Sequence, residues 1–258
     1  MNSSLFSLEG QVALITGATR GIGLAIARAY GRAGAKLVIS SENQADCERV
    51  AAELAGEGIE ACALAADLAD QAAVQALADA AQARHGRIDA LVCNAGVAPH
   101  LGPLASASAA DWELTMTVNL RSALWLTNAL LPVMAEQGGG SVVLMASIAG
   151  VRGNKGLGLY GLSKAALAQL ARNLAVEWGP RNVRVNAISP GVIATEFARP
   201  LTDNPAVMDK RLALTPLRRV GVPAEVAALA LLLAAPGGAF ITGQNLVVDG
   251  GTTIGDGN

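Results

Sequence analysis

The chain has 258 residues, of which 52% are hydrophobic and 16% are charged, and its formal net charge is −2. This composition is typical of a compact globular protein and excludes an intrinsically disordered one. Lys and Arg are scattered along the chain, so the sequence predicts neither a nucleic-acid-binding surface nor a surface for an anionic membrane.

Short apolar runs alternate with helical patterns along most of the chain. The runs predicted to be strands are 11–16, 36–40, 60–65, 87–93, 141–146, 183–188 and 245–249. The segments predicted to be helices are 24–33, 44–56, 70–84, 111–134, a stretch through residue 160 to about 178, and one that begins at residue 223. Because the strands are apolar on both faces, helices should cover both sides of the sheet. We predict one doubly wound α/β domain of the Rossmann type over residues 1–258, with a seven-stranded, mostly parallel sheet.

The ends of the chain and its cysteines indicate where the protein works. The first ten residues lack the basic and apolar regions of a signal peptide, and the longest apolar run, 226–235, is too short to cross a bilayer. The three cysteines show no CxxC spacing, which favours reduced thiols. His85 and His100 form no cluster with a nearby cysteine, so no metal site is predicted. We expect a cytoplasmic protein that binds no membrane.

A glycine-rich turn joins the first predicted strand to the first helix. Gly17, Gly21 and Gly23 would let the backbone approach a ligand closely, and the N–H groups that open the helix could hold a pyrophosphate. The spacing is G-x-x-x-G-x-G, which differs from the G-x-G-x-x-G fingerprint of dinucleotide-binding proteins. A tight turn without a ligand is the alternative.

Residues that could bind a ligand or take part in catalysis follow several of the predicted strands. They lie at 17–23, 41, 67, 94–96 and 147, each at the carboxyl end of a strand. In a doubly wound sheet ligands bind beyond these ends. We therefore expect these positions to converge on one site.

Tyr160 and Lys164 lie four residues apart on a predicted helix, and so one turn apart on one face. A cation beside a phenol should lower its pKa, ordinarily about 10, and let Tyr160 exchange a proton near neutral pH. Ser147 could offer its hydroxyl to the same reacting oxygen. Asn119, inside a mostly apolar helix, needs partners, and a hydrogen bond to a nearby loop is the simplest one. Taken alone, the Tyr-Lys spacing is a weak signal, because it is common on helix surfaces.

Together these motifs resemble those of the short-chain dehydrogenase/reductase family, over nearly the whole chain. The segments that match its cofactor-binding motifs contain Gly17, Gly21, Ile22, Gly23, Asp67, Leu68, Asn94, Ala95, Gly96, Pro190, Gly191, Ile193 and Thr195. Asn119, Ser147, Tyr160 and Lys164 match its catalytic tetrad in order and spacing. Cys93 stands where Asn is more usual in the family. It is either a small apolar side chain that fills space in the core or a thiol that is sensitive to oxidation. The most similar-looking members are 3-oxoacyl-acyl-carrier-protein reductases and broad-specificity carbonyl reductases.

The resemblance implies hydride transfer between a nicotinamide cofactor and a carbonyl or secondary alcohol. Tyr160 would be the general acid in reduction and the base in oxidation, and Lys164 would hold the cofactor ribose and lower the Tyr160 pKa. Ser147 would bind the substrate oxygen, and Asn119 would position a water that relays protons to Lys164. The three residues between Tyr160 and Lys164 argue against an enoyl reductase of this family, in which the gap is longer. A catalytically idle dinucleotide sensor is the alternative from another class of protein.

The cofactor should contact Thr19, Arg20 and Ser41 as well. An acidic residue at position 41 would accept from the ribose hydroxyls and repel a 2′-phosphate, whereas Ser41 is neutral. Arg20 could pair with that phosphate. We predict a preference for NADP(H), with NAD(H) as the alternative. Glu42 would reverse the preference if its side chain pointed inward, but the alternation along a strand directs it to solvent.

The substrate is expected to be a small carbonyl or alcohol compound. Its pocket should be built by residues 97–103 and 148–157 and by a mobile lid at about 195–215. Arg199, Arg211, Arg218 and Arg219 leave room for an acyl thioester on a carrier protein. His100 either faces the substrate or is solvated. Apolar faces on the helices at 114–134 and 159–178, with the family resemblance, predict a homotetramer.

Overall fold

All seven strands lie in one sheet, in the order β3-β2-β1-β4-β5-β6-β7, and each neighbouring pair is parallel. The computed structural model describes residues 3–255. The strands are β1 (Val12–Thr16), β2 (Lys36–Ser40), β3 (Ala61–Ala63), β4 (Ala90–Cys93), β5 (Gly140–Met145), β6 (Val183–Pro190) and β7 (Asn245–Val248). The predicted doubly wound, seven-stranded fold is therefore confirmed. The third and fourth strands are shorter than their apolar runs suggested.

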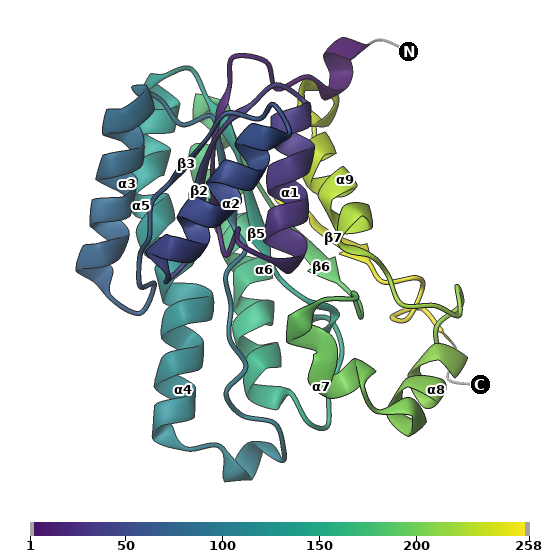
Figure 1. Cartoon of the computed structure of the whole chain (residues 1–258). Helices are drawn as coiled ribbons and strands as arrows, with labels where there is room; N and C mark the ends of the chain where they lie inside the picture. The colour runs from purple at the N-terminus through teal and green to yellow at the C-terminus, as the bar shows by residue number, and fades with distance from the viewer. Residues whose placement is uncertain (1–2, 256–258) are drawn as a thin grey trace.

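Helices cover both faces of this sheet (Figure 1). One layer consists of α1 (Gly21–Arg32), α2 (Gln44–Gly56) and α9 (Pro223–Ala234), and the other of α3 (Gln71–His85), α5 (Ser122–Glu136) and α6 (Gly158–Trp178). Successive side chains of β1 point to opposite faces of the sheet. Leu14 packs with the α3 layer and Ile15 with the α1 layer. The hydrophobic core therefore has two parts, one between each face of the β-sheet and the helices that cover it. No helix within residues 3–255 is both long and apolar enough to cross a membrane.

The single long helix predicted at 111–134 is interrupted. The structure has α4 (Ala109–Met116), a π-helical turn (Thr117–Arg121) and then α5. The hydrophobic pattern runs through the turn without a break, so it carries no signal of the interruption. A π turn often marks a functional site, and this one contains Asn119.

The segment expected to be an irregular lid is helical. It forms η6 (Glu196–Ala198), α7 (Arg199–Thr202) and α8 (Pro205–Ala213). The Asn204 side chain accepts from the N–H of Val207 and caps α8, and Pro205 occupies its first turn. Helices this short show too few turns for a clear period. Together with α4, this segment projects beyond the carboxyl ends of the strands (Figure 1).

Candidate active site

The glycine turn after β1 packs against the loop after β4. The Asn94 amide nitrogen donates to the carbonyl oxygens of Thr16 and Gly17, at 3.0 and 3.1 Å. Gly17 has φ of +62°, and a Cβ there would lie 2.9 Å from the Asn94 amide nitrogen. A Cβ at Gly23 would lie 2.1 Å from the carbonyl oxygen of Gly17. The first and last glycines of the motif are therefore required by packing within the turn.

The same turn offers unfilled hydrogen-bonding capacity. Arg20 is the N-cap of α1, and no side chain caps the N–H groups that open this helix. At the end of the neighbouring strand β2, the buried Ser40 hydroxyl has no hydrogen-bond partner among the described residues. Uncapped N–H groups at a helix N-terminus suit a pyrophosphate. These features fit a dinucleotide lying across β1 and β2.

Asn119 ties three elements together. Its Oδ1 accepts from the N–H of Val97 at 2.7 Å, and its Nδ2 donates to the Val97 carbonyl oxygen at 2.9 Å and to Ser163 Oγ at 3.0 Å. Ser163 in turn donates to the carbonyl oxygen of Tyr160. Asn119 therefore joins the loop after β4 to the first turns of α6. Ser163 was missed from the sequence, although its place three residues after Tyr160 on the same helix is the signal that could have found it.

Lys164 is fully enclosed at the base of the site. Its Nζ donates to the Met145 carbonyl oxygen at 2.7 Å and lies 5.4 Å from the centre of the Tyr160 ring. A Cβ at Gly96 would lie 3.2 Å from both Lys164 Nζ and Asn119 Oδ1, so glycine at this position leaves space between them. Burial lowers the pKa of Lys164 to about 8, against the opposing effect of Cys93.

The pKa of Tyr160 departs from the sequence-based expectation. Burial raises it to about 12, and the neighbouring Ser147 hydroxyl acts in the opposite direction. We expected Lys164 to lower it. The ammonium group is instead directed to the Met145 carbonyl oxygen, and the loss of solvent around the phenol dominates. Ser147 itself is held at the N-cap of η4 (Ile148–Gly150), where its hydroxyl accepts from the N–H of Ala149.

The lid segment meets both halves of this site. The Phe197 ring on η6 lies 5.9 Å from the Tyr160 ring, centre to centre. Thr195 lies against the glycine turn, since its methyl carbon would be 3.3 Å from a Cβ at Gly21. Arg20 and Glu196 form an ion pair at 3.9 Å, with both side chains exposed. Phe197 was not predicted, because nothing in the sequence places this ring beside Tyr160.

The remaining predicted cofactor contacts lie along the same edge. Ser41 is buried, with its hydroxyl 3.2 Å from Cys47 Sγ, and Glu42 is exposed, as the alternation predicts. Asp67 accepts from the N–H of Ala69, and Leu68 belongs to the core. Thr19 and Ile22 lie around the glycine turn, and Ala95 lies beside Gly17. Pro190 ends β6, and Gly191 and Ile193 follow it.

The structure gives Cys93 and His100 structural surroundings: Cys93 is buried, and the His100 ring contacts a serine of its own loop. Burial raises the pKa of the Cys93 thiol to about 12, which keeps it protonated and unreactive. His100 Nε2 lies 2.9 Å from Ser106 Oγ, so the ring is bound to its own loop.

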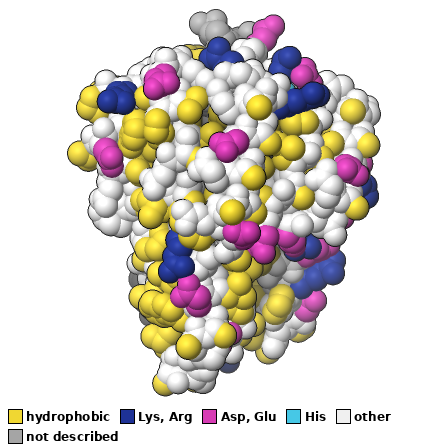
Figure 2. Space-filling view, turned by 90° about the vertical axis from the view of Figure 1, so that its left-hand side faces the viewer, with side chains coloured by type: hydrophobic (Ala, Val, Ile, Leu, Met, Phe, Trp, Pro, Cys, Tyr) yellow, Lys and Arg dark blue, Asp and Glu magenta, His cyan; other side chains and the backbone are white. Residues whose placement is uncertain are grey.

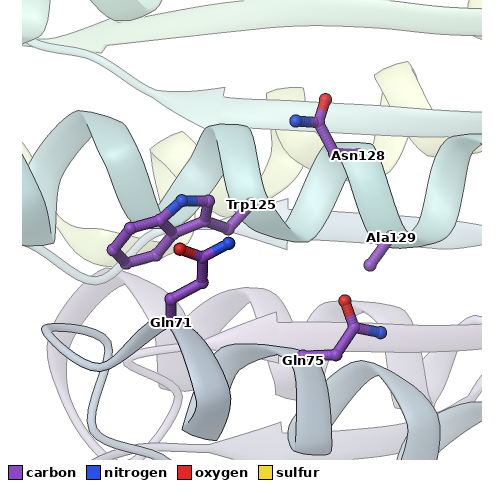
Figure 3. A pocket seen from close by; sticks show the side chains of 5 residues that line it. All are labelled: Gln71, Gln75, Trp125, Asn128 and Ala129. Carbon is purple, nitrogen blue, oxygen red and sulfur yellow. The ribbon is translucent and has the colours of Figure 1, made fainter.

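One hollow in the described part of the chain lies between two helices, and another is lined by loops and the lid. Figure 3 shows the smaller, about 150 Å³ between α3 and α5, lined by Gln71, Gln75, Trp125, Asn128 and Ala129. No predicted site residue lines it. The larger, about 420 Å³, is lined by residues from the loops at 101–102 and 152–157 and from the lid. Of Arg199, Arg211, Arg218 and Arg219, Arg211 is the one that lines it.

Comparisons with known proteins agree with this geometry. The family model described as enoyl-(acyl carrier protein) reductase matches residues 17–253. The D-threitol dehydrogenase of Mycolicibacterium smegmatis is 43% identical over 249 residues, which is 96% of this chain and 95% of that protein.

Two solved structures share the whole fold. A 7α-hydroxysteroid dehydrogenase in complex with NADH and 7-oxo glycochenodeoxycholic acid superposes with a TM-score of 0.93 at 36% identity, covering 97% of each chain. A gluconate 5-dehydrogenase from Burkholderia cenocepacia, in complex with NADP and tartrate, gives 0.95 at 34% identity and covers 98% of this chain and 99% of that one. The chain therefore belongs to the short-chain dehydrogenase/reductase family and is an NAD(P)-dependent oxidoreductase that acts on alcohol or carbonyl groups.

Proposed function

We propose that the chain reduces a ketone, or oxidises the corresponding secondary alcohol, with NADP(H) as its preferred cofactor. The observation that carries this proposal is the convergence of Ser147 and Lys164 on Tyr160 at the carboxyl edge of the sheet. Three residues separate Tyr160 from Lys164, which favours carbonyl reduction over the enoyl reduction named in the family description.

The residues divide the chemistry between them. The nicotinamide, when bound, supplies or accepts the hydride. In reduction the carbonyl carbon receives that hydride while its oxygen takes the proton from the Tyr160 phenol, so the C=O π bond is replaced by a C–H and an O–H bond. A phenol with a pKa near 12 holds its proton at neutral pH and is ready to donate it. Ser147 hydrogen-bonds the oxygen on which charge develops.

The cofactor would be held by the glycine turn and by Lys164. The uncapped N–H groups of α1 would bind the pyrophosphate, and Lys164 would bind the nicotinamide ribose. Both N–H donors of the Asn119 side chain are already engaged. A water that relays protons to Lys164 would therefore donate to an oxygen of Asn119, either the side-chain Oδ1 or the backbone carbonyl.

The preference for NADP(H) depends on the charges near the end of β2. Ser41 is neutral, Glu42 is exposed, and Arg20 has only a long, exposed ion pair with Glu196 to give up. A 2′-phosphate would offer Arg20 a stronger partner. The test is kcat/KM with NADPH and with NADH on one ketone, in the wild type and in Arg20→Ala. We expect Arg20→Ala to lose about tenfold with NADPH and little with NADH, since hydrogen bonds to charged groups are among the stronger ones. Faster wild-type turnover with NADH would refute the preference.

A panel of ketones, secondary alcohols and 2-enoyl thioesters tests the reaction class. Reduced-nicotinamide absorbance should change with the ketones and alcohols but not with the enoyl compounds. If cofactor binds and no compound is turned over, the idle-sensor alternative would be favoured. A carrier-protein substrate has little support from the lid, because Arg218 donates to the carbonyl oxygens of Leu212 and Ala213, and Arg219 pairs with Glu225.

We also propose that the protein assembles as a homotetramer in the cytoplasm. Large apolar side chains are exposed on α4, α5 and α6: Trp112, Leu114, Leu124, Leu162 and Val176. Figure 2 shows hydrophobic side chains gathered over the lower half of the face on which α4 lies. A second apolar group, Phe240, Val247 and Ile254, surrounds β7. Two apolar surfaces on one chain suit an assembly with two kinds of interface.

A further inference from the structure

The larger pocket and Tyr160 share the start of α6, although Tyr160 is not one of the residues that line the pocket. Leu157, one of its lining residues, is the N-cap of α6, and Tyr160 follows in the first turn of that helix. Three residues of helix rise by about 4.5 Å, so Leu157 lies within one turn of the proposed proton donor along the helix axis. The pocket is also lined by Leu201 of α7 and Arg211 of α8, from the same lid that brings Phe197 to the Tyr160 ring. A substrate held at Tyr160 would therefore extend into this pocket.

The charges that line this pocket all have one sign. Arg152, Lys155 and Arg211 line it, and no Asp or Glu does. Within residues 3–255, none of the three has a carboxylate within ion-pair distance or a side-chain hydrogen bond. Many other arginines do have such partners, for example Arg28 with Glu57. The positive charge of the pocket is thus not neutralised by the protein.

The fold holds two of these charges near each other in a partly desolvated place. Arg211 is half-buried, and its pKa is lowered first by burial and then by the nearby charge of Arg152. Like charges in such surroundings destabilise the empty pocket unless a ligand brings the opposite charge. The neighbouring Arg218 shows the alternative, because its guanidinium is satisfied by lid carbonyl oxygens.

The rest of the lining is apolar. Four leucines contribute to it: Leu101, Leu157, Leu201 and Leu214. The one amide side chain, Asn154, already accepts from the N–H groups of Gly156 and Leu157. The pocket therefore offers apolar surface and cationic donors, and suits a ligand with an apolar body and an anionic end.

We propose that the substrate carries a terminal anion, a carboxylate in the simplest case, bound by Arg152, Lys155 and Arg211 while its carbonyl or hydroxyl group lies at Tyr160. This inference rests on the proposed function, and it names the substrate class as oxo or hydroxy acids with an apolar spacer. Guanidinium groups bind carboxylates through paired hydrogen bonds, and the ammonium of Lys155 adds a third charge at the rim.

A matched pair of ketones tests the charge directly. The probes are 7-oxooctanoate and 7-oxooctanamide, which have the same length and the same reacting ketone but differ in charge. With the wild type and NADPH or NADH, we expect kcat/KM for the acid to exceed that for the amide by about tenfold or more. The preference should decline as salt is added, because part of the attraction is exposed to solvent. Equal kcat/KM for the two compounds would overturn the inference.

Substitutions in the pocket identify the residues responsible. Arg211→Gln and Arg152→Gln should each raise KM for the acid by about tenfold and leave the amide within about twofold. The matched control is Lys210→Gln, which removes an exposed cation from the same helix without touching the pocket. Arg152 is exposed, so its variant should fold even if the Arg211 variant does not. A parallel loss with acid and amide would contradict anion recognition.

Calorimetric titration of 7-oxooctanoate separates this inference from the proposed function. If neither ketone is turned over, the proposed activity fails, whereas the inference is still decided by binding. Binding of the acid that is lost in Arg152→Gln and retained in Lys210→Gln would support it. Absent binding, or equal binding in all variants, would overturn it.

Discussion

At the scale of single residues, the environment of each side chain decides its chemistry. The chain has two tyrosines, of which Tyr30 is fully buried and Tyr160 is partly buried. Tyr30 donates to the carbonyl oxygen of Ala230 and belongs to the core, whereas Tyr160 faces Ser147, Lys164 and the lid. The two residues therefore provide a matched comparison of a structural and a catalytic phenol.

Tyr160→Phe should remove most of the turnover, by about 10²–10⁴-fold, because it removes the proposed proton donor. Cofactor affinity, measured by fluorescence titration, should change little. The control, Tyr30→Phe, should keep kcat but lower the free energy of unfolding by about 1 kcal/mol, since it removes a buried hydrogen bond. Near-normal turnover in Tyr160→Phe would contradict the assignment.

Lys164 should make stability depend on pH. Burial lowers its pKa to about 8 from an ordinary 10.5, so both states carry the proton below pH 8 and the cost of burying the charge is then complete. Between about pH 8 and 10.5 the folded state loses the proton first. The unfolded state then binds more protons, and stability rises with pH.

Lys164→Met removes this titration while it preserves much of the side-chain volume. Relative to the variant, the wild type should gain up to about 3 kcal/mol as the pH rises through that window. Urea unfolding of both proteins at pH 7, 8, 9 and 10 measures the difference. Groups that do not interact with Lys164 titrate alike in both proteins and cancel. A difference that stays flat would show that the Lys164 pKa is not lowered.

At the scale of elements, the glycine turn is the part most sensitive to an added atom. Gly23→Ala would place a methyl group against the backbone of Gly17, which cannot move aside without displacing Asn94. We expect a loss of cofactor binding and a lower thermal midpoint. Gly56→Ala is the control: it ends α2 with open space around it, and should be neutral or stabilising by up to about 1 kcal/mol. Equal behaviour of the two variants would refute the packing argument.

The sequence predicts these elements well where pattern and chemistry coincide. The boundaries of β2 and α2 agree with the predicted 36–40 and 44–56, and Asp70 caps α3 at the start of the helix predicted over 70–84. The π turn at Asn119 could not be predicted, because a one-residue widening of a helix leaves the apolar pattern intact. The basic pocket could not be predicted for another reason: Arg211 is distant in sequence from Arg152 and Lys155, and only the docking of the lid brings it to them.

At the scale of the whole molecule, the exposed apolar faces should hold copies of the chain together. Val176 on α6 is 81% exposed, an unusual place for a β-branched apolar residue unless another chain covers it. Val176→Lys should convert the tetramer to a smaller species in sedimentation velocity at micromolar concentration. Ala52→Lys, on the exposed face of α2, should leave the assembly unchanged. A wild type that sediments as a monomer would refute the proposed assembly.

The strand order also governs how the chain reaches its native state. β1 lies inside the sheet, yet its second neighbour, β4, is contributed only after β2, β3 and their helices have been made: Ala13 pairs with Ala90. Every later pairing likewise closes a long loop, and the last strand, β7, completes an edge on β6. Such high contact order slows folding. It also leaves the edges of apolar strands unpaired during synthesis of the chain. The nascent chain is therefore most exposed to aggregation before β4 emerges, so a chaperone would contribute most during synthesis of its first third.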